Sequence, residues 1–139
     1  MAKAVWWFSC LIGITMKQHL SPPRLLSECE LRLIEYLLRM FQLPFKLDLP
    51  ISQTFVAELL DDGGMGSMQF LHKCRHKRMY GKPLIEVTPF DTDGRKVFLE
   101  LSVDEDDYLY ELDSFTTDFK ALKAPLGTTF VFEDIFIYE

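Results

Sequence analysis

The stretch PLIEVTPFDTDGRKVFLELSVDEDDYLYELDSF, residues 83–115, carries the clearest structural signal in the chain. Apolar and polar residues alternate in three of its segments, as they do along strands that are buried on one side. These segments are residues 83–90, 96–104 and 107–115. DTDG at 91–94 and the acidic DEDD at 104–107 have the composition of turns. We therefore expect three antiparallel strands joined by short connections.

Three further segments also have the composition of strands. Residues 54–60 (TFVAELL) and 67–72 (SMQFLH) flank a glycine-rich stretch, and the chain closes with TTFVFEDIFIYE, residues 128–139. The 12 Phe and 5 Tyr residues agree with a large share of strand, because aromatic side chains fit a pleated, half-buried surface. Short connections favour a meander, in which consecutive strands are neighbours.

One helix precedes these strands. Ser27 and Glu30 have the spacing of a capping box at its start, and Pro44 ends the pattern. Between them, apolar residues recur at helical spacing and form one stripe: Leu31, Ile34, Leu37, Leu38 and Phe41. A helix of this length is unstable alone in water. Its apolar stripe therefore has to pack on another element. These patterns predict an α+β fold, with an N-terminal helix packed on a mostly antiparallel meander sheet of about five to six strands.

The N-terminal segment MAKAVWWFSCLIGIT, residues 1–15, differs from the rest. An uncharged run follows Lys3 and is similar to the core of a signal peptide, but it is shorter than the roughly 20 residues that span a bilayer. No A-x-A-like cleavage site follows it. We expect residues 1–15 to be a dispensable extension or an upstream mis-start, with a signal or anchor segment as the alternative. Residues 16–139 are then expected to form a single domain.

Charge is distributed unevenly along the chain. The formal net charge is −6 over 139 residues. Residues 71–82 hold five basic and no acidic side chains, whereas residues 83–139 hold fourteen acidic and four basic ones. Because the C-terminal half is this acidic, it repels phosphate backbones. We therefore expect no nucleic acid among the partners.

Cysteine usage bears on the compartment. The chain has three cysteines, Cys10, Cys29 and Cys74, without the spacing of a disulfide framework. An odd number of this kind fits a reducing compartment. We therefore expect a cytoplasmic protein. Because the uncharged N-terminal run is too short to span a bilayer, we also expect no association with a membrane.

The glycine-rich stretch LLDDGGMGSMQF, residues 59–70, admits two interpretations. A phosphate-binding loop needs a Gly-Lys-Ser/Thr ending or a G-x-G-x-x-G pattern before a helix, and the stretch has neither. A hairpin turn explains more, because Gly63 and Gly64 can adopt positive φ and Gly66 suits a bulge or a close contact. We expect a turn.

Asp61 and Asp62 on this turn are candidates for a recognition tip that touches a partner. The alternative is a small hydrolase or ligand-binding enzyme whose site combines the Asp61–Ser67 turn with His72 or His76. That alternative predicts a deep pocket beside the turn, holding a His or Asp with a perturbed pKa. No complete catalytic pattern supports it, since the sequence after Ser67 lacks the second glycine of a nucleophile elbow.

Two clusters match metal sites only in part. His72, Cys74 and His76 alternate and would share one strand face, but a structural zinc site needs four ligands, and basic residues are interleaved with these three. Asp91 and Asp93 match a fragment of a calcium loop, and strands rather than helices flank them. We therefore expect no metal and no cofactor.

Acidic residues alternate with tyrosines in DEDDYLYELD, residues 104–113. Acidic side chains speed the encounter with a basic partner, and tyrosines anchor it. The candidate protein-binding residues are Asp104, Glu105, Asp106, Asp107, Tyr108, Tyr110, Glu111 and Asp113. We expect the partner to be a basic protein.

Residues 24–122 resemble a small uncharacterised bacterial domain family. The resemblance rests on the helix LLSECELRLIEYLL, the turn DDGGMGSMQF, the segment VTPFDTDGRKVFLELSVDEDDYLYELDSF and the later TDFKAL. The family's pattern is a helix, an Asp-Gly-Gly-Met-Gly hairpin and strands that end in ELD, an aromatic residue and DF. It implies no activity. In size, acidity and fold class it is similar to small immunity proteins, which bind and block one toxin domain.

These observations favour a non-enzymatic bacterial protein that binds another protein, as an immunity-type or regulatory partner. A toxin domain is the partner that the resemblance implies. A homo-oligomeric structural domain is a further alternative, in which the Phe-rich strand at 128–139 pairs across the edge of a homodimer.

Overall fold

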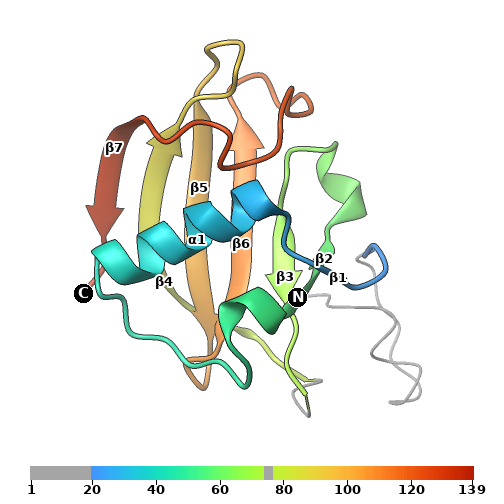
Figure 1. The fold of residues 1–139 in the computed structure, drawn as a ribbon, viewed down its shortest axis with the longest axis vertical. Helices are drawn as coiled ribbons and strands as arrows, with labels where there is room; N and C mark the ends of the chain where they lie inside the picture. The colour runs from blue at the N-terminus through green and yellow to red at the C-terminus, as the bar shows by residue number, and fades with distance from the viewer. Residues whose placement is uncertain (1–19, 74–76) are drawn as a thin grey trace.

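One helix covers one face of a seven-stranded sheet in the computed structural model, which describes residues 20–73 and 77–139 (Figure 1). The strands are β1 (Arg24–Leu25), β2 (Phe55–Glu58), β3 (Met68–Phe70), β4 (Tyr80–Pro89), β5 (Val97–Asp104), β6 (Leu109–Thr116) and β7 (Phe132–Ile137). Their order across the sheet is β1-β2-β3-β6-β5-β4-β7, and every neighbouring pair is antiparallel. The helix is α1 (Glu28–Met40), and two 3-10 turns, η2 (Ile51–Gln53) and η3 (Leu60–Asp62), complete the elements.

The α+β class with an antiparallel sheet is confirmed, but the predicted strand count is too low. The described residues form seven strands instead of five or six, partly because the two-residue β1 is too short to show any alternation. The expected meander is confirmed for β4, β5 and β6 and also for β1, β2 and β3, in which consecutive strands are neighbours. The order departs from a meander at two places: β3 pairs with β6 in the middle of the sheet, and β7 returns to pair with β4 at its end. Both pairings join distant parts of the sequence.

The capping box at the start of α1 is confirmed. The Ser27 hydroxyl accepts from the backbone N–H of Glu30 (3.2 Å), and the Glu30 carboxylate accepts from the backbone N–H of Ser27 (2.8 Å). The buried stripe contains Leu33 in place of Leu31, which is only half-buried. At 13 residues α1 is the longest helix within the described ranges, and none there is long and apolar enough to cross a bilayer.

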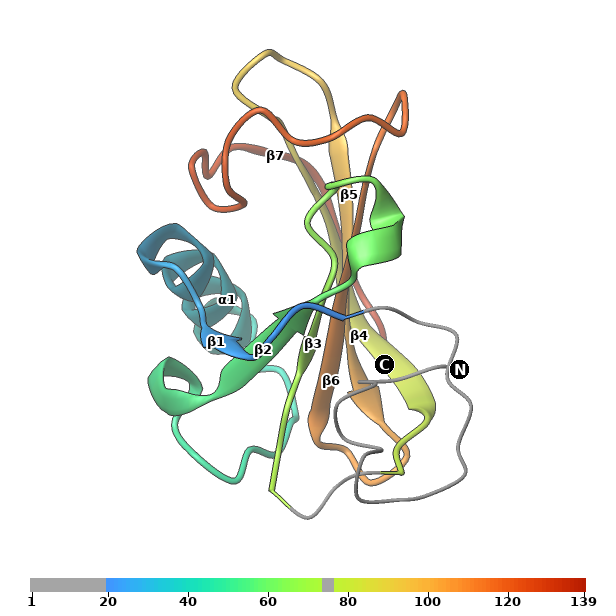
Figure 2. The same cartoon turned by 90° about the vertical axis from the view of Figure 1, so that its right-hand side faces the viewer.

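α1 lies along one side of the sheet (Figure 2). Its buried stripe shares one hydrophobic core with residues of the strands. Strand register determines which residues meet it: Val87 pairs with Leu99, Ile85 with Leu101, and Leu101 with Leu112. Paired residues point to the same side of a sheet, so all five side chains enter one core. All five are buried, and each contributes about 1.5–3 kcal/mol to folding.

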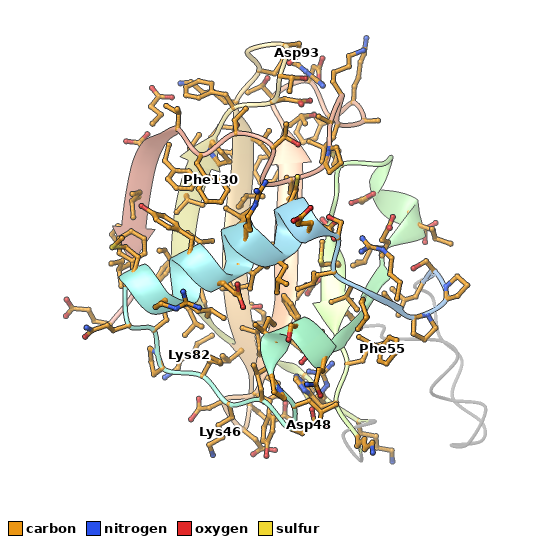
Figure 3. The ribbon with its side chains drawn as sticks, viewed as in Figure 1. Lys46, Asp48, Phe55, Lys82, Asp93 and Phe130 are labelled. Carbon is orange, nitrogen blue, oxygen red and sulfur yellow. The ribbon has the colours of Figure 1, made fainter. Side chains whose placement is uncertain are left out.

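Arg95 ties the β4–β5 connection to the segment that follows β6. Its guanidinium contacts Asp91 (2.9 Å), Asp93 (2.7 Å) and Asp118 (2.8 Å). The expected turn at 91–94 is confirmed, since the N–H of Gly94 donates to the carbonyl of Asp91 (2.9 Å). Figure 3 shows Asp93 at the far end of this hairpin. The carboxylates that matched part of a calcium loop therefore organise a turn around an arginine.

Gly127 lets the segment between β6 and β7 cross close to the start of α1. Its φ is +88°, and a Cβ at this position would overlap the carbonyl oxygen of Cys29. Gly94 has nearly the same φ, +90°, but a Cβ there would meet no atom within 4 Å. A substitution at Gly94 therefore tests backbone strain alone, whereas a substitution at Gly127 tests backbone strain together with steric overlap.

We expect Gly127→Ala to lower the free energy of unfolding by about 3 kcal/mol, because overlap with backbone adds to the left-handed strain. Gly94→Ala, the matched control, should lose only about 1 kcal/mol from that strain. Urea unfolding followed by circular dichroism measures both values. Equal losses in the two variants would show that the close approach at Cys29 does not constrain the fold.

Candidate functional site

The side of the sheet opposite α1 carries the candidate site. Side chains alternate along a strand, so Val97 and Leu99 enter the core while Phe98 and Glu100 point away from it. No helix of the described chain covers strands β4 to β7 on this side, as the edge-on view shows (Figure 2). We call this surface the open face. Its residues are Tyr80, Glu86, Phe98, Glu100, Glu111, Asp113, Phe115, Phe119, Phe136 and Tyr138.

Three carboxylates form a row across the middle of the open face. Glu86 on β4 is the direct cross-strand partner of Glu100 on β5, and Glu100 is the direct partner of Asp113 on β6. Like charges directly opposite each other destabilise a sheet. Among residues 20–73 and 77–139, no lysine or arginine forms a salt bridge with any of the three. The row therefore costs folding free energy.

Hydroxyl groups hold each carboxylate of the row in place. Tyr138 contacts Glu86 through its hydroxyl, the Tyr80 hydroxyl donates to Glu100 Oε2 (2.9 Å), and the Ser67 hydroxyl lies 3.2 Å from Asp113 Oδ1. The bond to Glu86, together with partial burial, raises the pKa of Tyr138 to about 12. These hydroxyls orient the carboxylates but bring no positive charge to them.

Glu100, at the centre of the row, has a perturbed pKa. Burial raises the pKa of this carboxyl, the hydrogen bond from Tyr80 opposes that effect, and the charges of Glu86 and Asp113 raise the pKa further. The net shift is upward, so the carboxylate form of Glu100 is less favourable in the folded protein than in water.

A row of aromatic rings lies beside the carboxylates. Phe98 and Phe115 stack with ring centroids 5.1 Å apart, and Phe115 stacks on Phe119 at 6.0 Å. Phe119 is 68% exposed and has a φ of +57°, in the left-handed region that bulky residues avoid. The chain therefore holds a large apolar ring in solvent on a strained backbone.

A shallow hollow of about 140 Å³ lies where the two rows meet. Its side chains include Glu86, Glu100 and Asp113 on the acidic side and Phe98 and Phe115 on the aromatic side. Lysine and arginine carry an apolar stem and a charged head, and an arginine guanidinium also stacks on aromatic rings. The hollow thus has the chemistry to accept a basic side chain.

The predicted protein-binding residues separate into three groups, and two of these residues are buried. Asp104 is 1% exposed: Oδ1 accepts from the backbone N–H groups of Asp106 (2.8 Å) and Tyr108 (3.0 Å), and Oδ2 lies 3.6 Å from Arg78. Tyr110 is also buried, and the Arg78 guanidinium lies 5.0 Å from its ring centroid. Asp104 and Tyr110 therefore stabilise the fold and do not reach the surface.

The other predicted residues lie in two separate places. Glu105, Asp106 and Asp107 are exposed on the β5–β6 turn, at the end of the sheet, and the half-buried Tyr108 follows them. Glu111 and Asp113 lie on the open face. Sequence reasoning missed Glu86, Glu100, Tyr80 and the aromatic row, although the alternation along β4 and β5 already placed Glu86 and Glu100 opposite the core.

The glycine-rich stretch connects the antiparallel strands β2 and β3, so the expected hairpin is confirmed. Asp62 organises the turn: its carboxylate accepts from the backbone N–H groups of Gly64 (2.9 Å), Met65 (3.2 Å) and Ser67 (2.8 Å). A Cβ at Gly66 would lie 2.8 Å from Leu122 Cδ1, which confirms the expected close contact. Of the two acids proposed as a recognition tip, Asp61 is exposed and Asp62 is engaged in the turn.

A cleft of about 480 Å³ lies beside this turn. Arg24 in its wall donates from Nη1 to Glu30 (2.8 Å) and from Nε to Glu58 (2.8 Å), and Lys123 lines the cleft as well. His72 does not line it: the buried imidazole lies 3.1 Å from Asp48 Oδ1 and 2.8 Å from the carbonyl oxygen of Leu109.

Two candidate ligands, Cys74 and His76, lie outside the described residues, as does the segment 1–15. Among residues 20–73 and 77–139, no three His, Cys, Asp or Glu side chains are grouped so that they could hold a metal ion.

The described residues form a small α+β domain in which α1 covers one side of the sheet and a row of carboxylates lies on the other. Residues 23–125 match DUF6984, a domain of unknown function, and the chain belongs to this family. The matched range contains α1 and β1 to β6, including the carboxylate row, whereas β7 lies beyond it. No curated protein and no solved structure matches the chain.

We expect Glu100→Gln to raise the free energy of unfolding at pH 7 by about 0.5 kcal/mol, because it removes the central charge of the row and leaves an acceptor for Tyr80. The pKa of Glu100 is higher in the folded than in the unfolded protein. Its protonated form therefore favours folding, and that contribution is lost as the pH rises through the folded pKa. The gain from the variant should thus vanish below a pH of about 4.

Urea unfolding at pH 7 and pH 3.5 tests this expectation. Glu35→Gln on α1 is the control, since it removes the same charge from the side of the molecule away from the row. A decrease in stability of Glu100→Gln at pH 7 would show that the row is not repulsive.

Proposed function

We propose that this protein is a non-enzymatic binding protein whose open face receives a basic segment of another protein. The observation that carries the proposal is the direct cross-strand row of Glu86, Glu100 and Asp113. A lysine or arginine placed between these carboxylates would remove the repulsion that the free protein bears. Binding would then recover free energy that the unbound sheet has given up.

The aromatic row supports the same proposal. Exposed aromatic residues next to a charged groove are typical anchors of protein interfaces. Phe115 and Phe119 are both exposed and stack on each other, so they offer a preformed apolar platform beside the hollow. A partner segment would place a basic head among the carboxylates and its apolar stem on this platform.

The acidity of the chain favours an immunity-type or regulatory role for this binding protein. In that role the open face masks a basic surface of its partner, such as a toxin domain, and no chemical step is needed. Long-range attraction between a chain of net charge −6 and a basic protein would speed their association. We propose the cytoplasm as the place of this function, because the cysteines lack disulfide spacing.

A short peptide rich in arginine and lysine is the first probe. We expect it to shift the amide NMR signals of β4, β5 and β6 around the carboxylate row, with an affinity that falls as salt rises. Glu100→Gln/Asp113→Asn should weaken binding at least about tenfold, whereas Glu28→Gln/Glu35→Gln, which removes the same charge from α1, should not. Signals that shift instead at Glu105, Asp106 and Asp107 would place the binding surface on the turn and overturn the proposal.

Phe119→Gly isolates the aromatic contribution. Glycine accepts a φ of +57° without strain, so this variant should keep the wild-type melting temperature within a few degrees while it removes the exposed ring. We expect weaker affinity for the partner that the wild-type chain captures from the native organism, by at least about tenfold. Unchanged affinity would exclude the aromatic row from the interface.

A small-molecule site is the second candidate function, and the cleft beside the glycine-rich turn favours it. Its volume of about 480 Å³ is in the range of ligand pockets, and Arg24, Glu58 and Lys123 provide charged groups in its wall. A ligand bound there should raise the melting temperature of the wild type more than that of Lys123→Gln. A screen in which no compound separates the two proteins would remove this candidate.

A further inference from the structure

β7 is the outermost strand of the sheet beyond β4, and it presents an apolar edge. Ile135 is 45% exposed, Phe136 57% and Ile137 41%, although all three are large apolar residues in consecutive positions. Natural proteins usually protect a sheet edge with lysines, prolines or bulges at its centre. The sequence of β7, FEDIFI, has no lysine or proline. The register irregularity in its pairing with β4 lies between Phe132 and Ile135, before the apolar centre of the strand.

No strand of the described residues pairs with the outer edge of β7, where Ile135 and Ile137 direct their backbone groups. The N–H of Tyr138 donates to the carbonyl of Leu84 (3.0 Å), so Tyr138 faces β4. Inward and outward backbone groups alternate along an antiparallel strand, so Phe136 also faces β4 while its two neighbours face outward. The outward groups have the spacing that a further antiparallel strand requires.

We propose that a second copy of this chain pairs with β7 through its own β7, antiparallel and centred on Phe136. Two-fold symmetry about this residue places Ile135 of one copy opposite Ile137 of the other, with their outward groups hydrogen-bonded. The two Phe136 rings then face each other across the axis. Every central position of the pairing is apolar on both sides, so the strand is complementary to itself.

Charges in β7 are compatible with this register. Asp134 falls opposite Tyr138, and Glu133 falls at the end of the pairing, opposite Glu139. Lys96 pairs with Glu133 within each chain (2.9 Å), which compensates the charge at that end. Acidic side chains therefore flank the interface and do not enter its centre.

Apolar surface continues from the edge onto the helix side. Phe130, which precedes β7, lies beside α1 in Figure 3, with its ring 5.4 Å from that of Tyr36. Phe130 is 41% exposed and Val131 68%. In the proposed register residues 130 and 131 lie beyond Glu139 of the second copy, so the side-chain burial that adds to the strand hydrogen bonds comes from Ile135, Phe136 and Ile137.

Sedimentation equilibrium of the full chain tests the proposal and involves no partner protein, so its result does not depend on the proposed function. We expect a concentration-dependent dimer of twice 16.3 kDa. Ile135→Lys should weaken dimerisation at least about tenfold with an unchanged circular dichroism spectrum. Leu60→Lys, at a position that is 57% exposed and far from β7 in the sheet order, is the matched control and should dimerise as the wild type does.

A wild-type chain that remains monomeric at all concentrations overturns the proposal. So does a dimer that persists unchanged in Ile135→Lys, since it would use another surface.

Cross-linking tests the register. In a background with Cys10, Cys29 and Cys74 replaced by serine, Phe136→Cys should form a disulfide-linked dimer under diamide, because residues at a non-hydrogen-bonded position on the axis lie within disulfide distance. Ile135→Cys is the control and should not cross-link to itself, because its counterpart in the other chain is Ile137. Cross-linking of Ile135→Cys in preference to Phe136→Cys would overturn the register.

Discussion

The packing of a single apolar helix stripe on a broad antiparallel sheet is the constraint on which the rest of this structure depends. Leu33, Ile34 and Leu37 of α1 are almost fully buried against one side of the sheet. A single helix covers only one side, so the period-two alternation of the strands delivers polar and aromatic residues to the other. The open face follows directly from the presence of one helix on strands β4 to β6.

Carboxylates in this protein divide into two physical classes. Asp62 and Asp104 accept backbone N–H groups and organise turns, so each contributes to folding where it stands. Glu86, Glu100 and Asp113 face one another across three strands, and burial and repulsion raise the pKa of the central one. Acids that oppose folding are the stronger candidates for function, because stability alone gives no reason to keep them.

Phe136 connects the two surfaces that we propose. It is the cross-strand partner of Glu86, next to the carboxylate row, and it is also the centre of the β7 edge. The family match contains the row but ends before β7. Partner binding is therefore proposed for the family domain, and pairing through β7 is proposed for the segment that this chain carries after it.

Local patterns were sufficient for the helix cap at Ser27, the α+β class and the turn at 91–94, because each depends on residues within a few positions of one another. They failed where distant segments meet. The pairing of β7 with β4 and of β3 with β6 depends on the whole chain, as does the burial of Asp104 beside Arg78. The consecutive acids at 104–107 predicted a binding surface at that turn. The carboxylate row instead consists of acids from three strands, which only the folded sheet brings together.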